Sequence, residues 1–149
     1  MPTANMTTVY LIRHAEALAR EDWSEDDRDR PLTEKGRKQA FQLAQRLRKS
    51  GIREVRTSPA HRCRETVVPL ATALGVELLV DNDLFEGSGV LKLPAGEGAY
   101  ALCSHGDNIP ATLDALGVKW EKCKKGSVWK LELAKTGKVL DAEYIPPTS

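Results

Sequence analysis

Strand-type and helical segments alternate along most of this chain, and that alternation limits the possible folds more than any other feature. Four short runs are rich in β-branched, aliphatic and aromatic residues: 8–13, 53–57, 76–80 and 99–104. Helical patterns of apolar residues occupy 33–50, 58–75 and 107–116. Such an order is typical of a mostly parallel sheet with helices on both faces. We therefore expect an α/β fold with three layers, α/β/α.

Residues with capping side chains mark where the predicted helices begin. Thr33 is suited to cap the first helix. Ser58 and Pro59 form an N-cap and N1 pair for the second helix. For the third helix, either Asp107 or Asn108 can be the cap.

The last third of the chain predicts a different kind of strand pair. Runs of strand type at 128–133 and 139–145 flank the turn sequence Lys-Thr-Gly at 135–137. This pattern predicts an antiparallel hairpin at an edge of the sheet. A length of 149 residues suits one domain. We expect a flexible tail over residues 1–7 and a single domain over 8–149.

Charge and cysteine content exclude several classes of partner. Lys and Arg number 22 against 21 Asp and Glu, so overall charge cannot drive binding to nucleic acid or to a membrane surface. No stretch approaches the roughly 20 apolar residues of a membrane span, and residues 1–8 lack the pattern of a secretory signal. Three widely spaced cysteines are typical of free thiols in a reducing compartment. We expect a cytoplasmic monomer that binds neither nucleic acid nor membrane.

Polar residues capable of chemistry follow each predicted parallel strand. In chain order they are Arg13 and His14; Ser58, His61 and Arg62; Asp81, Asp83 and Glu86; His105 and Asp107. The carboxyl ends of parallel strands meet at one edge of the sheet, where ligands bind. Two arginines and up to three histidines are therefore expected at one rim.

Arg62 has an unusual position for a cation. It falls in the first turn of a predicted helix, where the helix dipole disfavours positive charge. Backbone N–H groups and a guanidinium at that place form a strong anion site. The alternative is an arginine that pairs with Glu65 or points to solvent.

Four short segments contain most of these residues. They are 11–17 (LIRHAEA), 30–36 (RPLTEKG), 58–66 (SPAHRCRET) and 104–106 (SHG). In this order and spacing they resemble the motifs of the histidine phosphatase superfamily, and 30–36 resembles its small SixA-type phosphohistidine phosphatase branch. The final hairpin, from Gly126 onward, also resembles the SixA branch, and it is similar to the phosphatase-like domain fused to some Nudix hydrolases. The resemblance implies a phosphoglycerate mutase-like fold over residues 8–145.

The resemblance also implies roles for individual residues. His14 matches the nucleophile that becomes phosphorylated, and Arg13, Arg62 and His105 match the other members of the phosphate pocket. We count Ser58, which follows the second predicted strand, among the substrate-binding residues.

The general acid is a separate question, and two carboxylates are candidates. Glu86 has the right location for this role, while Asp107 could also reach the site or merely cap its helix. The segment 81–98 departs from many relatives because it is short and rich in glycine.

Other phosphatase chemistries do not fit the sequence. A cysteine phosphatase needs Cys-x5-Arg, and the residues six positions after the cysteines are Pro69, Ile109 and Trp129. The spacing of His14, His61, His105 and Asp107 matches no compact metal motif. We expect a phosphatase without metal or cofactor that works through a phosphohistidine on His14.

Three classes of function remain open for such a site. A SixA-like phosphatase would act on a histidine-phosphorylated protein, and a small-molecule phosphomonoesterase would act on a sugar phosphate or nucleotide. A phosphate-binding module without turnover is disfavoured by the full set of arginines and histidines. The glycine-rich segment 81–98 predicts an open site, and acidic residues of 15–32 would repel highly anionic small substrates. Both features favour the protein substrate.

Overall fold

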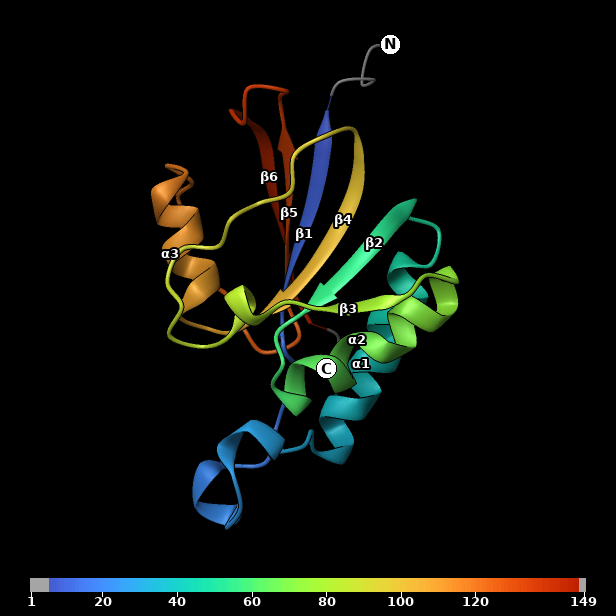
Figure 1. Cartoon of the computed structure of the whole chain (residues 1–149), viewed down its shortest axis with the longest axis vertical. Helices are drawn as coiled ribbons and strands as arrows, with labels where there is room; N and C mark the ends of the chain where they lie inside the picture. Colours follow the sequence, from blue (N-terminus) through green and yellow to red (C-terminus); the bar gives the residue numbers. More distant parts are fainter. Residues whose placement is uncertain (1–5, 148–149) are drawn as a thin grey trace.

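The computed structural model describes residues 6–147 and contains one six-stranded sheet in the order β3-β2-β4-β1-β5-β6 (Figure 1). The strands are β1 Thr7–Arg13, β2 Ile52–Thr57, β3 Leu78–Val80, β4 Gly98–Ser104, β5 Val128–Leu133 and β6 Val139–Ile145. Strands β3, β2, β4 and β1 run parallel, whereas β5 is antiparallel to β1 and β6 is antiparallel to β5. The predicted parallel sheet with a C-terminal hairpin at its edge is confirmed.

Three helices cover the two faces of this sheet. They are α1 Glu34–Leu47, α2 His61–Leu74 and α3 Asn108–Ala115. Tyr10 and Ile12 of β1 belong to the core cluster that contains buried residues of α1 and α2. Val9 and Leu11 point to the other face, where they share a core cluster with residues of α3. Figure 1 shows α3 on one side of the sheet and α1 with α2 on the other, so the three-layer prediction is confirmed.

The helix starts agree with the sequence only in part. Thr33 Oγ1 accepts a hydrogen bond from Gly36 N at 3.0 Å, which confirms the cap of α1. The predicted start of α2 at Ser58 and Pro59 is wrong, because the N-cap is Ala60 and no side chain caps this helix. The hydroxyl of Ser58 is instead shared with His105, whose Nε2 lies 2.8 Å from it.

The third strand is shorter than predicted because the capping turn of the preceding helix extends beyond its last residue, Leu74. Gly75 closes α2 in the left-handed conformation, with φ 70°. The next residue, Val76, donates from its N–H to the carbonyl of Ala71 at 3.1 Å. That bond keeps residue 76 in the helix terminus, so β3 begins only at Leu78.

Two irregular segments lie around the carboxyl ends of the strands. Residues 15–32 contain two short 3-10 helices, Arg20–Asp22 and Asp27–Asp29, and Figure 1 shows this blue segment protruding from the body of the molecule. Residues 81–98 contain the 3-10 helix Asn82–Leu84, followed by turns and bends before β4. Both segments form walls of the site described below.

The structure also bears on the predicted N-terminal tail and on the expected lack of a membrane span. Of the predicted tail, residues 1–5 lie outside the described part of the structure, and Thr7 is the first residue of β1. The last two residues of the predicted domain, 148 and 149, also lie outside it. Within residues 6–147, every helix is too short or too polar to span a bilayer.

Candidate active site

The register of two parallel strands brings two histidines together. Arg13, the last residue of β1, pairs with Ser104, the last residue of β4. His14 and His105 follow directly, and their ring centroids lie 5.5 Å apart in an edge-on arrangement. The predicted convergence of these two segments, about ninety residues apart in sequence, is confirmed.

His14 is held as a neutral imidazole with a defined free nitrogen. Its Nδ1 lies 2.8 Å from the carbonyl oxygen of Ala15, which can only accept a hydrogen bond, so Nδ1 bears the proton. His14 as a whole residue is 6% exposed. Burial lowers the pKa of His14 to about 3, and the positive charges of His105, Arg62 and Arg13 act in the same direction. At neutral pH, therefore, Nε2 has a free lone pair and can act as a nucleophile.

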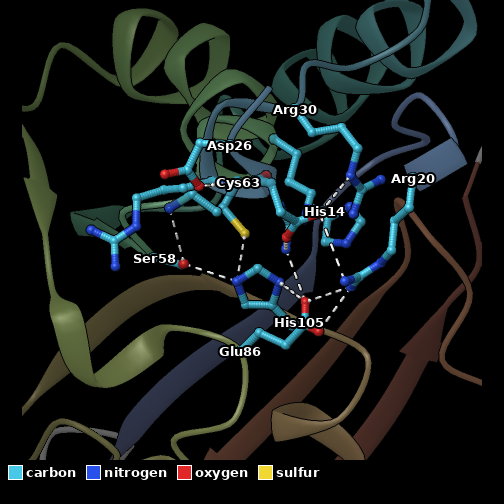
Figure 2. A network of polar contacts seen from close by, with 12 residues as sticks. His14, Arg20, Asp26, Arg30, Ser58, Cys63, Glu86 and His105 are labelled. Carbon is cyan, nitrogen blue, oxygen red and sulfur yellow. Dashed lines mark hydrogen bonds and ion pairs between the residues drawn. The ribbon is translucent and has the colours of Figure 1, made fainter. Parts of the chain in front are cut away.

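His105 is fixed from both edges of its ring (Figure 2). Nε2 shares a hydrogen bond with Ser58 Oγ at 2.8 Å and lies 3.5 Å from Cys63 Sγ. On the opposite edge, Nδ1 is 3.5 Å from Glu86 Oε1 but has no hydrogen-bond partner of good geometry. Ser58 is fully buried behind this ring. That position is suited to orienting His105, and direct contact of Ser58 with substrate stays a prediction.

Arg62 lies in the first turn of α2 and is fully buried. Its Nη1 donates to the carbonyl of Asp27 at 2.9 Å, and its Nη2 donates to Glu86 Oε1 at 2.8 Å. The alternative of a solvent-facing or Glu65-paired arginine is wrong. Glu65 instead accepts the N–H of Leu32 at 2.9 Å.

Arg13 packs flat against a glycine. A Cβ added to Gly106 would lie 2.6 Å from Arg13 Cζ, so only glycine allows the guanidinium this close. Arg13 Nη1 donates to the carbonyl of Cys123 at 2.7 Å, which fixes the side chain further.

Three buried nitrogens of the site lack a hydrogen-bond partner among the described residues. They are Arg13 Nε, Arg62 Nε and His105 Nδ1. A buried donor without a partner costs roughly 1–3 kcal/mol, and native proteins rarely tolerate several together without a ligand. An anion with several oxygens, such as a phosphoryl group, fits this set of donors.

Glu86 lies inside the site, but as an ionised carboxylate. Burial acts to raise its pKa, whereas the hydrogen bonds and charges of Arg20 and Arg62 outweigh burial and hold the pKa below the ordinary value. Arg20 Nη2 donates to Glu86 Oε2 at 2.9 Å. A general acid needs a proton at neutral pH, and this arrangement removes it. The role of Glu86 as the acid therefore stays a prediction.

Asp107 is the other carboxylate near the site. It occupies the N-cap position of α3, but its side chain makes no capping bond. Its Oδ2 accepts the N–H of Gly87 at 2.8 Å instead and joins the segment 81–98 to the rim. The side chain of Asp107 therefore holds the segment 81–98 and does not cap its helix.

The site opens into a cavity of about 490 Å³ whose lining includes residues that the sequence did not identify. Its charged lining residues are Arg13, Arg20, Glu21, Arg30, Glu86, Asp107 and Lys125. Arg30 donates from Nε to Asp27 Oδ1 at 3.0 Å and is 6% exposed. It is the first residue of segment 30–36, so the motif could have indicated it. Arg20 lies in no motif.

His61 is not part of this cavity. It is half-exposed, lies 3.5 Å from Glu65 and lines a different cavity beside Phe41. Two histidines, not three, thus meet at the rim. Among residues 6–147, no group of three or more His, Cys, Asp or Glu side chains could hold a metal ion.

Comparison with known proteins gives both a family and relatives. The model of the histidine phosphatase superfamily (branch 1) matches residues 9–91. An 8-oxo-(d)GTP phosphatase of Mycolicibacterium smegmatis is 30% identical over 94% of this chain and 48% of its own length. The probable phosphoglycerate mutase GpmB of Shigella dysenteriae is 39% identical over 58% of this chain and 41% of its own length. The chain thus spans about half the length of these curated relatives.

A solved structure supports the fold. The protein histidine phosphatase SixA complexed with tungstate superposes with a TM-score of 0.72 at 19% identity, covering 95% of this chain and 96% of that one. The family match includes His14, Arg62 and Glu86, and the geometry joins them to His105. The chain belongs to the histidine phosphatase superfamily (branch 1).

Proposed function

We propose that this protein is a phosphatase that works through a phosphohistidine on His14. The observation that carries the proposal is the hydrogen bond from His14 Nδ1 to the Ala15 carbonyl, which leaves Nε2 unprotonated amid buried cations. In the first step, Nε2 bonds to phosphorus while the bond to the leaving group breaks. In the second step, water attacks the phosphorus, the P–N bond breaks and inorganic phosphate departs. The leaving group takes up a proton from solvent in the first step; in the second step the water leaves one proton on the released phosphate and returns the other to solvent.

The side chains of the site provide the charge that a metal would otherwise bring. Arg13 and Arg62 can donate to the phosphoryl oxygens as charge builds on them, and His105 can donate from Nδ1. We further propose that the enzyme needs neither metal nor cofactor and acts as a monomer in the cytoplasm.

A histidine-phosphorylated protein is the first substrate class that we propose. The pKa of Glu86 lies below its ordinary value, so this carboxylate holds no proton for a poor ester leaving group. The P–N bond of phosphohistidine is labile and places a smaller demand on such an acid. The likeness to the SixA structure also supports this class.

Nucleotide phosphates are the second candidate, and a specific observation favours them. The relative aligned over 94% of this chain has the name 8-oxo-(d)GTP phosphatase. The protruding segment 15–32 was expected to repel anionic small molecules, yet it presents Arg20 and Arg30 to the cavity beside Glu21.

Turnover of a phosphohistidine protein, sugar phosphates and nucleotides tests these proposals, with each assay run with and without EDTA. We expect EDTA to change nothing, His14→Ala to abolish turnover, and kcat/KM for the phosphohistidine protein to lead by at least about tenfold. The matched control is His61→Ala, which removes a histidine outside the cavity and should retain activity. Turnover by His14→Ala would contradict the mechanism, and loss of activity in EDTA would contradict metal independence. A lead for nucleotides would favour the second class.

A further inference from the structure

A second cavity adjoins the one into which the site opens, which we call the catalytic cavity. It has a volume of about 710 Å³, and its charged lining residues are Arg13, Glu16, Lys35, Lys122, Lys124 and Lys125. Arg13 and Lys125 also line the catalytic cavity, so the two spaces meet at these side chains. We call the second space the lysine cavity.

The charge of the lysine cavity is strongly positive and largely uncompensated. Its only carboxylate among the lining residues belongs to Glu16, whose Oε2 is already bonded by Thr33 Oγ1 at 2.7 Å. None of the ion pairs formed within residues 6–147 includes any of the four lysines. In the catalytic cavity, by contrast, Arg20 is paired with Glu86 and Arg30 with Asp27. The cations of the lysine cavity thus remain available to an anionic ligand.

Backbone hydrogen bonds fix the lysine-bearing segment 122–125 to the nucleophile. Gly126 N donates to the carbonyl of His14 at 3.0 Å, and the Cys123 carbonyl accepts from Arg13 Nη1 at 2.7 Å. Ser127 N closes the turn by donating to the carbonyl of Lys124 at 2.9 Å. These bonds place the backbone of the lysine-bearing segment at a set position relative to the attacking nitrogen. An anion bound there would lie beside the phosphoryl group that His14 attacks.

The volume of the lysine cavity indicates a small ligand. Its volume falls in the range typical of small-molecule sites, roughly 300–1,000 Å³. A cluster of lysines in a concave space beside a phosphoryl site is suited to another phosphate of the same molecule.

We propose that the lysine cavity binds a second phosphate group of small-molecule substrates, so that among small molecules the enzyme prefers those with two or more phosphates. Nucleoside diphosphates and triphosphates and inorganic polyphosphates share this chemistry. The proposal rests on the phosphatase reaction at His14 and specifies which small molecules that reaction takes.

Direct binding tests the proposal without requiring turnover. We would titrate the wild-type full chain at constant ionic strength with methylphosphonate and methylenediphosphonate, which differ by one phosphonate group and resist hydrolysis. We expect the diphosphonate to bind at least about tenfold more tightly. The double variant Lys35→Met/Lys124→Met should lose most of that preference while binding methylphosphonate normally.

Matched lysines outside the cavity provide the control. Lys38 is exposed on α1 one turn beyond Lys35, and Lys138 lies in the exposed turn before β6. The double variant Lys38→Met/Lys138→Met removes the same charge and should keep the preference. Equal loss in both double variants would reduce the effect to net charge and overturn the proposal. Equal affinity of the wild type for the two phosphonates would also overturn the proposal. The lysines would then be available to contact the surface of a protein substrate.

Two further arms complete the design. Tighter binding of α,β-methylene ADP than of methylenediphosphonate would identify nucleotides as the source of the second phosphate, and equal binding would favour inorganic polyphosphate. If the chain prefers the diphosphonate but never forms phospho-His14, the second phosphate site stands and the proposed reaction at His14 is refuted. If His14 is phosphorylated but the diphosphonate is not preferred, the reaction stands and the second phosphate site is refuted.

Discussion

Burial keeps His14 in the neutral form that the proposed attack requires, at a cost in stability. Its ordinary pKa of 6.5 applies in the unfolded chain, whereas burial lowers the pKa to about 3 in the native site. Below pH 6.5 the unfolded state binds a proton that the native state refuses. The free energy of unfolding therefore falls as the pH drops from about 6.5 toward 3, by up to about 1.4 kcal/mol per pH unit.

Urea unfolding at pH 7.5 and pH 5.0 measures this cost. We expect wild type to lose about 1–2 kcal/mol more between these pH values than His14→Gln, which has no such proton to bind. His61→Gln changes a half-exposed histidine and should follow wild type. Equal losses in wild type and His14→Gln would show that the native ring is protonated as readily as in the unfolded chain.

Arg62 is needed for its shape as well as its charge. Two of its nitrogens are held by Asp27 and Glu86, so Nε is presented in a fixed direction. Arg62→Lys keeps the charge but loses this planar fork. We expect kcat/KM to fall at least about tenfold, or about 1.4 kcal/mol. Arg64→Lys, two residues later on α2 and outside the catalytic cavity, should stay near wild type, and similar kinetics for both variants would contradict this role.

At the scale of elements, two motif glycines allow close approaches of different kinds. A Cβ on Gly36, in the first turn of α1, would lie 2.0 Å from the backbone oxygen of Glu16. A Cβ on Gly106 would instead meet the end of the Arg13 side chain. Backbone cannot move aside easily, whereas a side chain can, although here it would leave the phosphate site.

The two alanine variants should therefore separate stability from activity. Gly36→Ala should lower the thermal midpoint strongly, whereas Gly106→Ala should lower it little and reduce kcat/KM at least about tenfold. Thermal unfolding and steady-state kinetics on both proteins check this. A Gly106→Ala enzyme with wild-type kinetics would mean that the position of Arg13 against residue 106 does not matter.

Elements governed by local patterns could be predicted from the sequence, and those governed by tertiary contacts could not. The runs ending at Arg13 and Ser104 predicted the strands that carry His14 and His105, because buried strands and their parallel order follow from local pattern. Ser58 looked like a helix cap, yet its hydroxyl bonds a histidine 47 residues away. Arg20 reaches Glu86 across 66 residues, and no local pattern contains that contact.

At the scale of the whole molecule, the sheet positions the two histidines and the irregular segments form the walls of the site. The adjacent strands β1 and β4 fix the two histidines, and β5 lies beside β1 on its other side. The segments 15–32 and 81–98 then add Arg20, Arg30 and Glu86 from outside the sheet. Because the walls come from loops and the centre from strands, the loops can change which substrate fits such a pocket while the chemistry of its centre stays the same.

The central claim is that His14 becomes phosphorylated, and one measurement tests it most directly. Enzyme mixed with a 32P-labelled substrate is quenched in denaturant within the first turnover, and the protein-bound label is assayed in acid and in alkali. The account predicts a label that is stable in alkali, labile in acid, localised to the peptide with His14 and absent from His14→Ala. Label that survives acid, maps to another residue or persists in His14→Ala would contradict the account.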